Sequence, residues 1–140
     1  MQLSHSNAKA LLFDLNQDIE ECAEATVKNI IEEKNFDNFA YPPNNVLTEL
    51  EKVELAKLDN NEHLKNALRK VLADNTAGVI FNLLNLLDGT GSPKHYYDEW
   101  TGVKLIDEEA NEDTKPFDDT LHDSFFETYW EWRNVRGGKG

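Results

Sequence analysis

The amino-acid sequence predicts an all-α or mostly α fold, organised as a single-domain bundle of four to five helices over residues 1–140. Apolar residues recur at steps of three and four through most of the chain, which is the spacing of one helix face. No segment alternates long enough to suggest a sheet, and the sequence has no internal repeats. The bundle is expected to pack around a buried helix near 76–88, which is apolar on nearly all sides.

The first predicted helix runs from about Asn7 to Lys34. Ser6 or Asn7 is expected to cap its start by accepting a hydrogen bond from an otherwise unpaired backbone N–H. Cys22 falls on the apolar face, where a small thiol is typical of a core residue rather than a nucleophile. That face comprises Leu11, Leu12, Leu15, Ile19, Cys22, Ala23, Val27 and Ile30.

A connector at 35–45 contains two adjacent prolines, which exclude a continuing helix. Its aromatic side chains, Phe36, Phe39 and Tyr41, are expected to fold onto the core. A second helix follows over about 46–58. Its apolar positions are Val46, Leu47, Leu50 and Val53.

Residues 62–88 form either one kinked helix or two, because Asp74-Asn75-Thr76 could cap a new helix. Gly89 suits the left-handed position just past a helix C-terminus. The segment at 94–119 is predicted to be an irregular, acidic strap. Within it, 103–106 forms either a short strand or an extended stretch.

A terminal helix is expected to start at Asp118 or Asp119, either of which can cap it, and to run to about Val135. Residues 136–140 are predicted to be a disordered tail.

The net charge of −13 is distributed unevenly along the chain. Residues 1–60 and 95–140 each hold twelve Asp and Glu against five Lys and Arg, whereas 61–94 holds three against four. This balance argues against nucleic acid as a ligand, because phosphate contact requires clustered Lys and Arg. No apolar run approaches the roughly 18 residues of a membrane span, and the first residues show no signal-peptide pattern. A single cysteine fits a reducing compartment, so we expect a cytoplasmic protein without membrane contact.

The predicted terminal helix is the most unusual segment. Its apolar stripe leaves out Phe126 and Trp130, while Asp123, Glu127 and Glu131 stack on the remaining side. Like charges at this spacing repel, and no Lys or Arg in the helix is placed to offset them. Two interpretations follow: a solvated acidic side with both aromatics packed under the strap, or a surface that faces a partner. The stripe comprises Leu121, Phe125, Tyr129, Trp132 and Val135.

A second concentration of acidic residues lies in the strap. Calcium sites use oxygen ligands of this type, but the residue spacing of a dedicated calcium loop is absent. The segment is therefore a solvated acidic loop, a contact for a basic partner or a cation site. Its acidic residues are Asp107, Glu108, Glu109, Glu112, Asp113, Asp118 and Asp119.

Metal-ligand candidates are few. On a helix, Asp118 or Asp119 could share a side with His122, but a carboxylate-bridged di-metal bundle needs a Glu-x-x-His pair from each of two helices. Neither a phosphate-binding loop nor a catalytic triad is assembled by the remaining residues. We therefore expect no cofactor, and Asp118, Asp119 and His122 remain the candidates for a metal.

These observations predict a binding protein rather than an enzyme. We expect an acidic inhibitor that docks on a basic partner protein, and a bacterial toxin-immunity protein is the specific example. The alternatives are a metal-dependent hydrolase that uses His122 with Asp118, Asp119, Asp123 or Asp88, and a self-associating structural protein that forms a homo-oligomer. The predicted partner-binding residues are Asp107, Glu108, Glu109, Glu112, Asp113, Asp123, Phe126, Glu127, Trp130 and Glu131.

Overall fold

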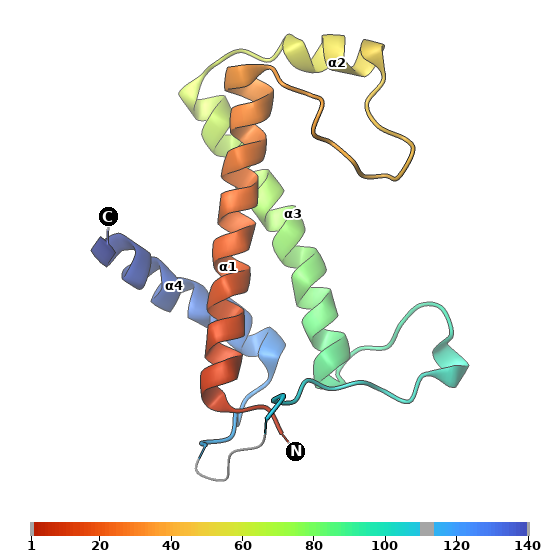
Figure 1. Ribbon diagram of the computed structural model, residues 1–140, viewed down its shortest axis with the longest axis vertical. Helices are drawn as coiled ribbons and strands as arrows, with labels where there is room; N and C mark the ends of the chain where they lie inside the picture. The colour runs from red at the N-terminus through yellow and green to blue at the C-terminus, as the bar shows by residue number, and fades with distance from the viewer. Residues whose placement is uncertain (1, 110–113, 140) are drawn as a thin grey trace. The chain divides into compact units, whose positions relative to one another are not determined.

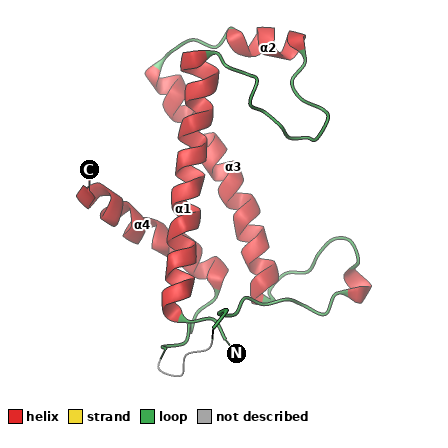
Figure 2. Ribbon diagram, viewed as in Figure 1, coloured by secondary structure: helices red, strands yellow, loops and turns green. Residues whose placement is uncertain are grey.

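The computed structural model describes residues 2–109 and 114–139. Within these residues the regular secondary structure is helical and includes no β-strand, which confirms the all-α class (Figures 1 and 2). The elements are α1 (His5–Val27), the π-helix η1 (Lys28–Glu33), α2 (Glu49–Ala56), α3 (Glu62–Asp88), the 3₁₀ turn η2 (Tyr97–Glu99) and α4 (Leu121–Lys139).

The chain packs as two compact units. One consists of Met1–Ile19 with Thr76–Gly140, and the other of Glu20–Asn75. Helices α1 and α3 each contribute residues to both units. The single domain expected over 1–140 stays a prediction.

Helix α1 begins two residues before the predicted start, because Ser4 caps it. The Ser4 hydroxyl accepts a hydrogen bond from the backbone N–H of Asn7 at 3.2 Å, in place of the cap expected at Ser6 or Asn7. The helix continues as η1 and ends at Lys34, which adopts a left-handed conformation with φ of 52°. Together α1 and η1 account for the helix predicted over Asn7–Lys34.

The buried face of α1 includes two polar side chains and excludes the cysteine. Asn16 and Glu20 are buried, whereas Cys22 is exposed, so the prediction of a core cysteine is wrong. Cys22 immediately precedes buried Ala23, and one residue turns a helix by about 100°, which places the thiol at the edge of the face. The buried apolar members are Ala8, Leu12, Ile19, Ala23 and Val27.

In the unit Glu20–Asn75, α2 begins at Glu49 because Thr48 and Glu51 form a capping box. The predicted apolar side of this helix is mostly in solvent: Leu50 is 80% exposed. Tyr41 is 86% exposed, so it does not plug the core. Leu55 and, just before the helix, Leu47 are half-buried, whereas Val46 and Val53 are exposed.

Helix α3 is one continuous helix over Glu62–Asp88, which decides between the two sequence alternatives. Its C-terminal half is not the most buried part of the fold, contrary to the prediction for 76–88. Leu84 is buried, whereas Val79 is 64% and Leu83 48% exposed. A helix that is apolar on all sides buries only the side that neighbours cover, and the exposed side of α3 has no such cover among the described residues.

Gly89 ends α3 in the left-handed conformation that the sequence predicts, with φ of 75°. The backbone N–H groups of Thr90 and Gly91 donate to the carbonyl of Asn85 at 3.0 and 3.2 Å. Residues 103–106 form no strand.

The strap instead pairs with the N-terminal residues. Asp107 N–H donates to the Gln2 carbonyl at 3.0 Å, and Phe117 N–H donates to the Leu3 carbonyl at 2.9 Å. His5 N–H donates in turn to the Lys115 carbonyl at 2.9 Å. These bonds fix the residues just before α4 against the start of α1.

Helix α4 extends to Lys139. The disordered tail expected over 136–140 stays a prediction. No helix in the described ranges combines the length and apolar character needed to cross a membrane.

Candidate functional site

Helix α4 is positioned by a polar contact with the first part of α1. The Asn16 amide donates to the carbonyl of Leu12 at 3.0 Å and to that of Phe125 at 3.3 Å. Trp132 Nε1 donates to Gln17 at 3.4 Å, about two helical turns beyond Phe125 along α4. The buried side of α4 comprises Leu121, Ser124, Phe125, Thr128 and Trp132, which leaves its other side free to face solvent.

That other side forms the α4 face, which we define as Asp123, Phe126, Glu127, Trp130 and Glu131. All five side chains are exposed, and their spacing of three and four places them on one helix surface. Phe126 is 55% and Trp130 68% exposed, so the interpretation that packs both aromatics under the strap is wrong. The structure thus brings together five of the ten predicted partner-binding residues.

The aromatic rings of the α4 face are supported on one side. Phe126 lies 5.5 Å from the Phe81 ring of α3 and 5.1 Å from Phe125, measured between ring centroids. Trp130 meets Tyr129 edge-to-face at 5.1 Å. Such contacts hold the rings in place while their outer surfaces remain accessible.

The acidic side chains of the α4 face are not all unpaired, which corrects the sequence expectation. Lys9 on α1 forms an ion pair with Glu131 at 2.8 Å. The Thr120 hydroxyl donates to Asp123 at 2.7 Å, and His122 Nε2 lies 3.4 Å from the same carboxylate. Among the described residues, Glu127 has no such partner. The pairing was missed because Lys9 comes from a distant part of the sequence.

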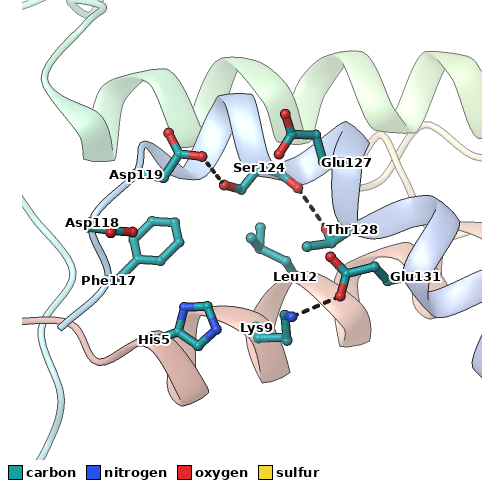
Figure 3. Close-up of a pocket in the computed structure, with 10 residues that line it drawn as sticks. All are labelled: His5, Lys9, Leu12, Phe117, Asp118, Asp119, Ser124, Glu127, Thr128 and Glu131. Carbon is teal, nitrogen blue, oxygen red and sulfur yellow. Dashed lines mark hydrogen bonds and ion pairs between the residues drawn. The ribbon is translucent and has the colours of Figure 1, made fainter. Parts of the chain in front are cut away.

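A pocket of about 180 Å³ lies beside this face, between the start of α1, the end of the strap and α4 (Figure 3). We call it the α1–α4 pocket; Glu127 and Glu131 belong both to it and to the α4 face. Leu12 and Phe117 give the pocket its apolar surface, and its other lining residues are charged, hydroxylic or imidazole side chains. The lining residues are His5, Lys9, Leu12, Phe117, Asp118, Asp119, Ser124, Glu127, Thr128 and Glu131.

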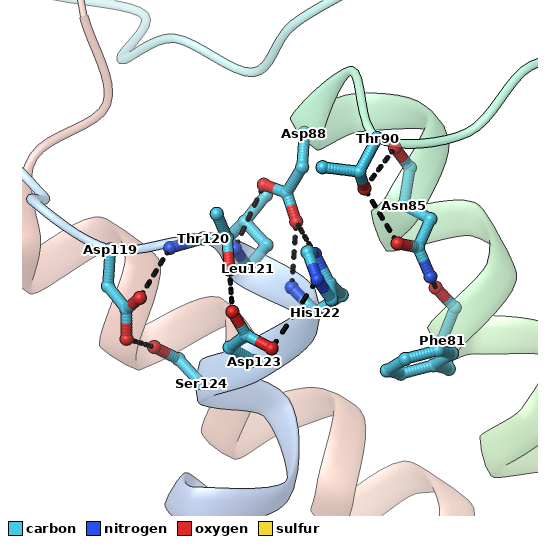
Figure 4. Close-up of polar contacts among 10 residues, drawn as sticks. All are labelled: Phe81, Asn85, Asp88, Thr90, Asp119, Thr120, Leu121, His122, Asp123 and Ser124. Atoms are coloured by element: carbon cyan, nitrogen blue, oxygen red, sulfur yellow. Dashed lines mark hydrogen bonds and ion pairs between the residues drawn. The ribbon is translucent and has the colours of Figure 1, made fainter.

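The Asp119 carboxylate of the pocket accepts two hydrogen bonds. The Ser124 hydroxyl donates to it at 2.7 Å and the Thr120 backbone N–H at 2.8 Å (Figure 4). The Ser124 bond, followed by the Thr120 bond, lowers the pKa of Asp119 below its usual value. Asp119 is therefore a carboxylate at neutral pH. Asp118, the next pocket acid, is exposed and has no partner among the described residues.

The N-terminus of α4 is capped from α3 rather than by Asp118 or Asp119. Asp88 accepts the backbone N–H of Leu121 at 2.9 Å and that of His122 at 2.8 Å (Figure 4). The same carboxylate lies 2.6 Å from His122 Nδ1. An Asp at the C-terminal end of its own helix opposes the helix dipole. This unfavourable position is the signal in the sequence that could have indicated a capping role for Asp88 at another helix.

Two of the three residues predicted as metal candidates, Asp119 and His122, are engaged in other contacts. His122 faces Asp88 and Asp123, and its ring stands edge-on to Phe81 with centroids 5.6 Å apart. Asp119 is bound to Ser124. Within residues 2–109 and 114–139, no three or more His, Cys, Asp or Glu side chains are grouped so that they could hold a metal ion.

The acidic residues of the strap have separate roles. Asp107 accepts the backbone N–H of Ser4 at 2.9 Å, and this bond lowers the pKa of Asp107 although desolvation opposes it. Asp107 therefore fixes the strap to the N-terminus. Glu108 and Glu109 are exposed, and Glu112 and Asp113 lie outside the described residues.

Comparisons of the chain with protein-family models, with curated proteins and with solved structures found no match. The function is therefore argued from the α4 face and the pocket beside it.

Proposed function

We propose that this chain is a non-enzymatic, acidic binding protein that docks on a basic partner protein through the α4 face. The observation that carries the proposal is the exposure of Phe126 and Trp130, at 55% and 68%, among carboxylates on one helix surface. Exposed aromatic residues surrounded by charge are typical of protein interfaces.

The two kinds of side chain have different tasks in this proposal. Trp130 and Phe126 lose their exposed surface on docking and supply most of the binding free energy, since buried aromatics dominate interface energetics. An arginine of the partner can also stack on the Trp130 ring. The negative charge of the chain, −13 in total, speeds the encounter with a basic partner. The strap acids Glu108 and Glu109 add to this long-range attraction.

The concrete version is a cytoplasmic immunity protein that blocks a basic, nuclease-like bacterial toxin. The excess of acidic over basic residues, 27 against 14, supports a basic protein and not nucleic acid as the partner. The partner to test first is the protein encoded beside this chain, and a secreted toxin with a basic C-terminal domain is the expected neighbour.

The test measures association and dissociation rates with that basic domain over a range of salt concentrations. Trp130→Ala is expected to speed dissociation at least about tenfold, because a central aromatic contact is lost. Glu127→Gln is expected to slow association and to reduce its salt dependence. Tyr97→Ala is the matched control, since Tyr97 is 66% exposed but lies outside the α4 face.

Two results would contradict the proposal. One is an association rate that does not change with ionic strength. The other is a concentration-dependent dimer of the chain alone that Trp130→Ala converts to a monomer in sedimentation experiments. That second result would show that the α4 face binds another copy.

A further inference from the structure

We propose that the α1–α4 pocket receives the side chain of one arginine of the basic partner. The inference rests on the proposed function and specifies the group that the pocket recognises. The pocket adjoins the docking surface, because Glu127 and Glu131 line the pocket and belong to the α4 face.

The size of the pocket selects a single side chain. Its volume is about 180 Å³, whereas pockets for cofactors and drug-sized ligands span roughly 300–1,000 Å³. A long side chain that enters from a docked protein fits this volume without a change of backbone.

The apolar surface of the pocket suits the aliphatic part of an arginine. Leu12 and Phe117 are the two apolar residues that line the pocket, Phe117 half-buried beside Asp118 and Leu12 only 1% exposed (Figure 3). Arginine and lysine side chains place their methylene stems on apolar surface and keep the charged end among polar groups.

The wall of the pocket carries more negative charge than the chain itself offsets. Four carboxylates line it, against one lysine and one histidine. Lys9 forms an ion pair with Glu131 at 2.8 Å, so one ammonium group of the chain is already bound at this wall. Asp118 and Glu127 have no comparable partner among the described residues.

The two unpaired carboxylates favour a guanidinium over an ammonium group. Asp118 lies at the end of the strap and Glu127 lies on α4, so these two pocket-lining carboxylates come from different segments. A planar guanidinium group has five N–H donors and can bond two carboxylates at once, whereas an ammonium group is a compact point charge.

The test uses the protein alone with butylguanidinium as the probe, followed by NMR on the Leu12 methyl and Phe117 ring signals. We expect saturable shifts at both residues. Butylammonium should bind several-fold more weakly, and uncharged butylurea should not saturate. Glu127→Gln and Asp118→Asn should each weaken butylguanidinium binding about fivefold. Asp14→Asn, which removes an exposed carboxylate of α1 outside the pocket, should leave the binding unchanged.

Two results would overturn the inference. One is an equal loss of butylguanidinium affinity in Glu127→Gln, Asp118→Asn and Asp14→Asn. The other is equal binding of butylguanidinium and butylurea. Helical circular dichroism of each variant verifies folding. Because this titration needs no partner, its failure leaves the Trp130→Ala dissociation experiment unaffected, and the two proposals can fail separately.

Discussion

Single polar side chains decide how α4 sits on α1. Asn16 and Thr128 lie in the buried contact, and Asn16 bonds to backbone carbonyls of both helices. Thr128 donates to the carbonyl of Ser124 at 2.9 Å. In the described part of the chain, every buried side-chain nitrogen or oxygen has a hydrogen-bond partner. An apolar pattern alone therefore could not identify this contact, since polar residues stand at its centre.

The Ser124–Asp119 hydrogen bond is expected to make stability depend on pH. The pKa of Asp119 is lowered in the folded chain, so its contribution is present above the unfolded pKa of about 3.9 and is lost as pH falls through the lower folded pKa. Ser124→Ala should reduce the free energy of unfolding at pH 7 by about 1 kcal/mol or less, because Asp119 is solvent-exposed. Urea unfolding at pH 7, 5 and 3 measures the difference.

The difference between wild type and Ser124→Ala should begin to shrink as pH falls below the unfolded pKa of about 3.9, because the contribution of the lowered Asp119 pKa is lost on the way down to the folded pKa. Asp119→Asn provides the second comparison and should show the same loss of pH dependence. A Ser124→Ala deficit that stays constant from pH 7 to pH 3 would assign the effect to packing instead.

The conformation or burial of a single residue was predicted correctly where its immediate neighbours in the sequence determine it. Gly89 adopts the left-handed conformation that a helix end requires, and Leu12 is buried. Cys22 and Tyr41 are exposed although both are apolar in type. Cys22 lies at the edge of the buried face of α1, whereas the exposure of Tyr41 depends on which other segments cover it, and a local sequence pattern does not specify this.

At the scale of elements, α4 is held at its start by a carboxylate from α3. Asp88→Ala should cost about 2 kcal/mol, because two part-buried N–H groups of Leu121 and His122 lose their acceptor. Asp88→Asn retains one acceptor oxygen and should cost roughly half as much. Hydrogen exchange checks this: Asp88→Ala should speed exchange along α4 and leave α2, which lies in the other unit, unchanged.

His122→Ala distinguishes the two roles of Asp88, which caps the α4 backbone and also contacts the His122 ring. It removes the ring that lies 2.6 Å from Asp88 but retains both backbone bonds. We expect a smaller change in α4 exchange than in Asp88→Ala. Equal changes in the two variants would show that the ring contact, and not the cap, fixes the helix.

The existence of the helices was predictable, while their starts and partners were not. The spacing of apolar residues identified α1, α3 and α4, and α3 proved to be a single helix. The starts of α1 and α4 are set by Ser4 and Asp88, and the second of these comes from another helix. The α4 face followed from the sequence because exposure there depends on the helix's own periodicity. The pocket did not, since it requires α1 and the strap beside α4.

At the scale of the whole molecule, the charge of −13 raises the question of whether repulsion or ion pairing governs stability. Ion pairs are present: Lys65 lies 3.0 Å from Glu32 and 2.6 Å from Glu62, and these contacts raise its pKa. Surface pairs of this kind are screened by solvent and contribute little to stability. Acidic residues outnumber basic ones almost two to one, so unpaired like charges should dominate.

We therefore expect the melting temperature to rise by a few degrees between about 0.01 M and 0.3 M sodium chloride, because the screening length falls from about 30 Å to below 8 Å over this range. Thermal unfolding followed by circular dichroism measures the rise. Potassium chloride should give the same curve, since screening depends on ionic strength and not on the cation. Asp14→Asn removes one exposed negative charge and should raise the melting temperature at low salt more than at high salt. A melting temperature that falls with added salt would show that the ion pairs of Lys65 and Lys9 outweigh the repulsion between the remaining acids.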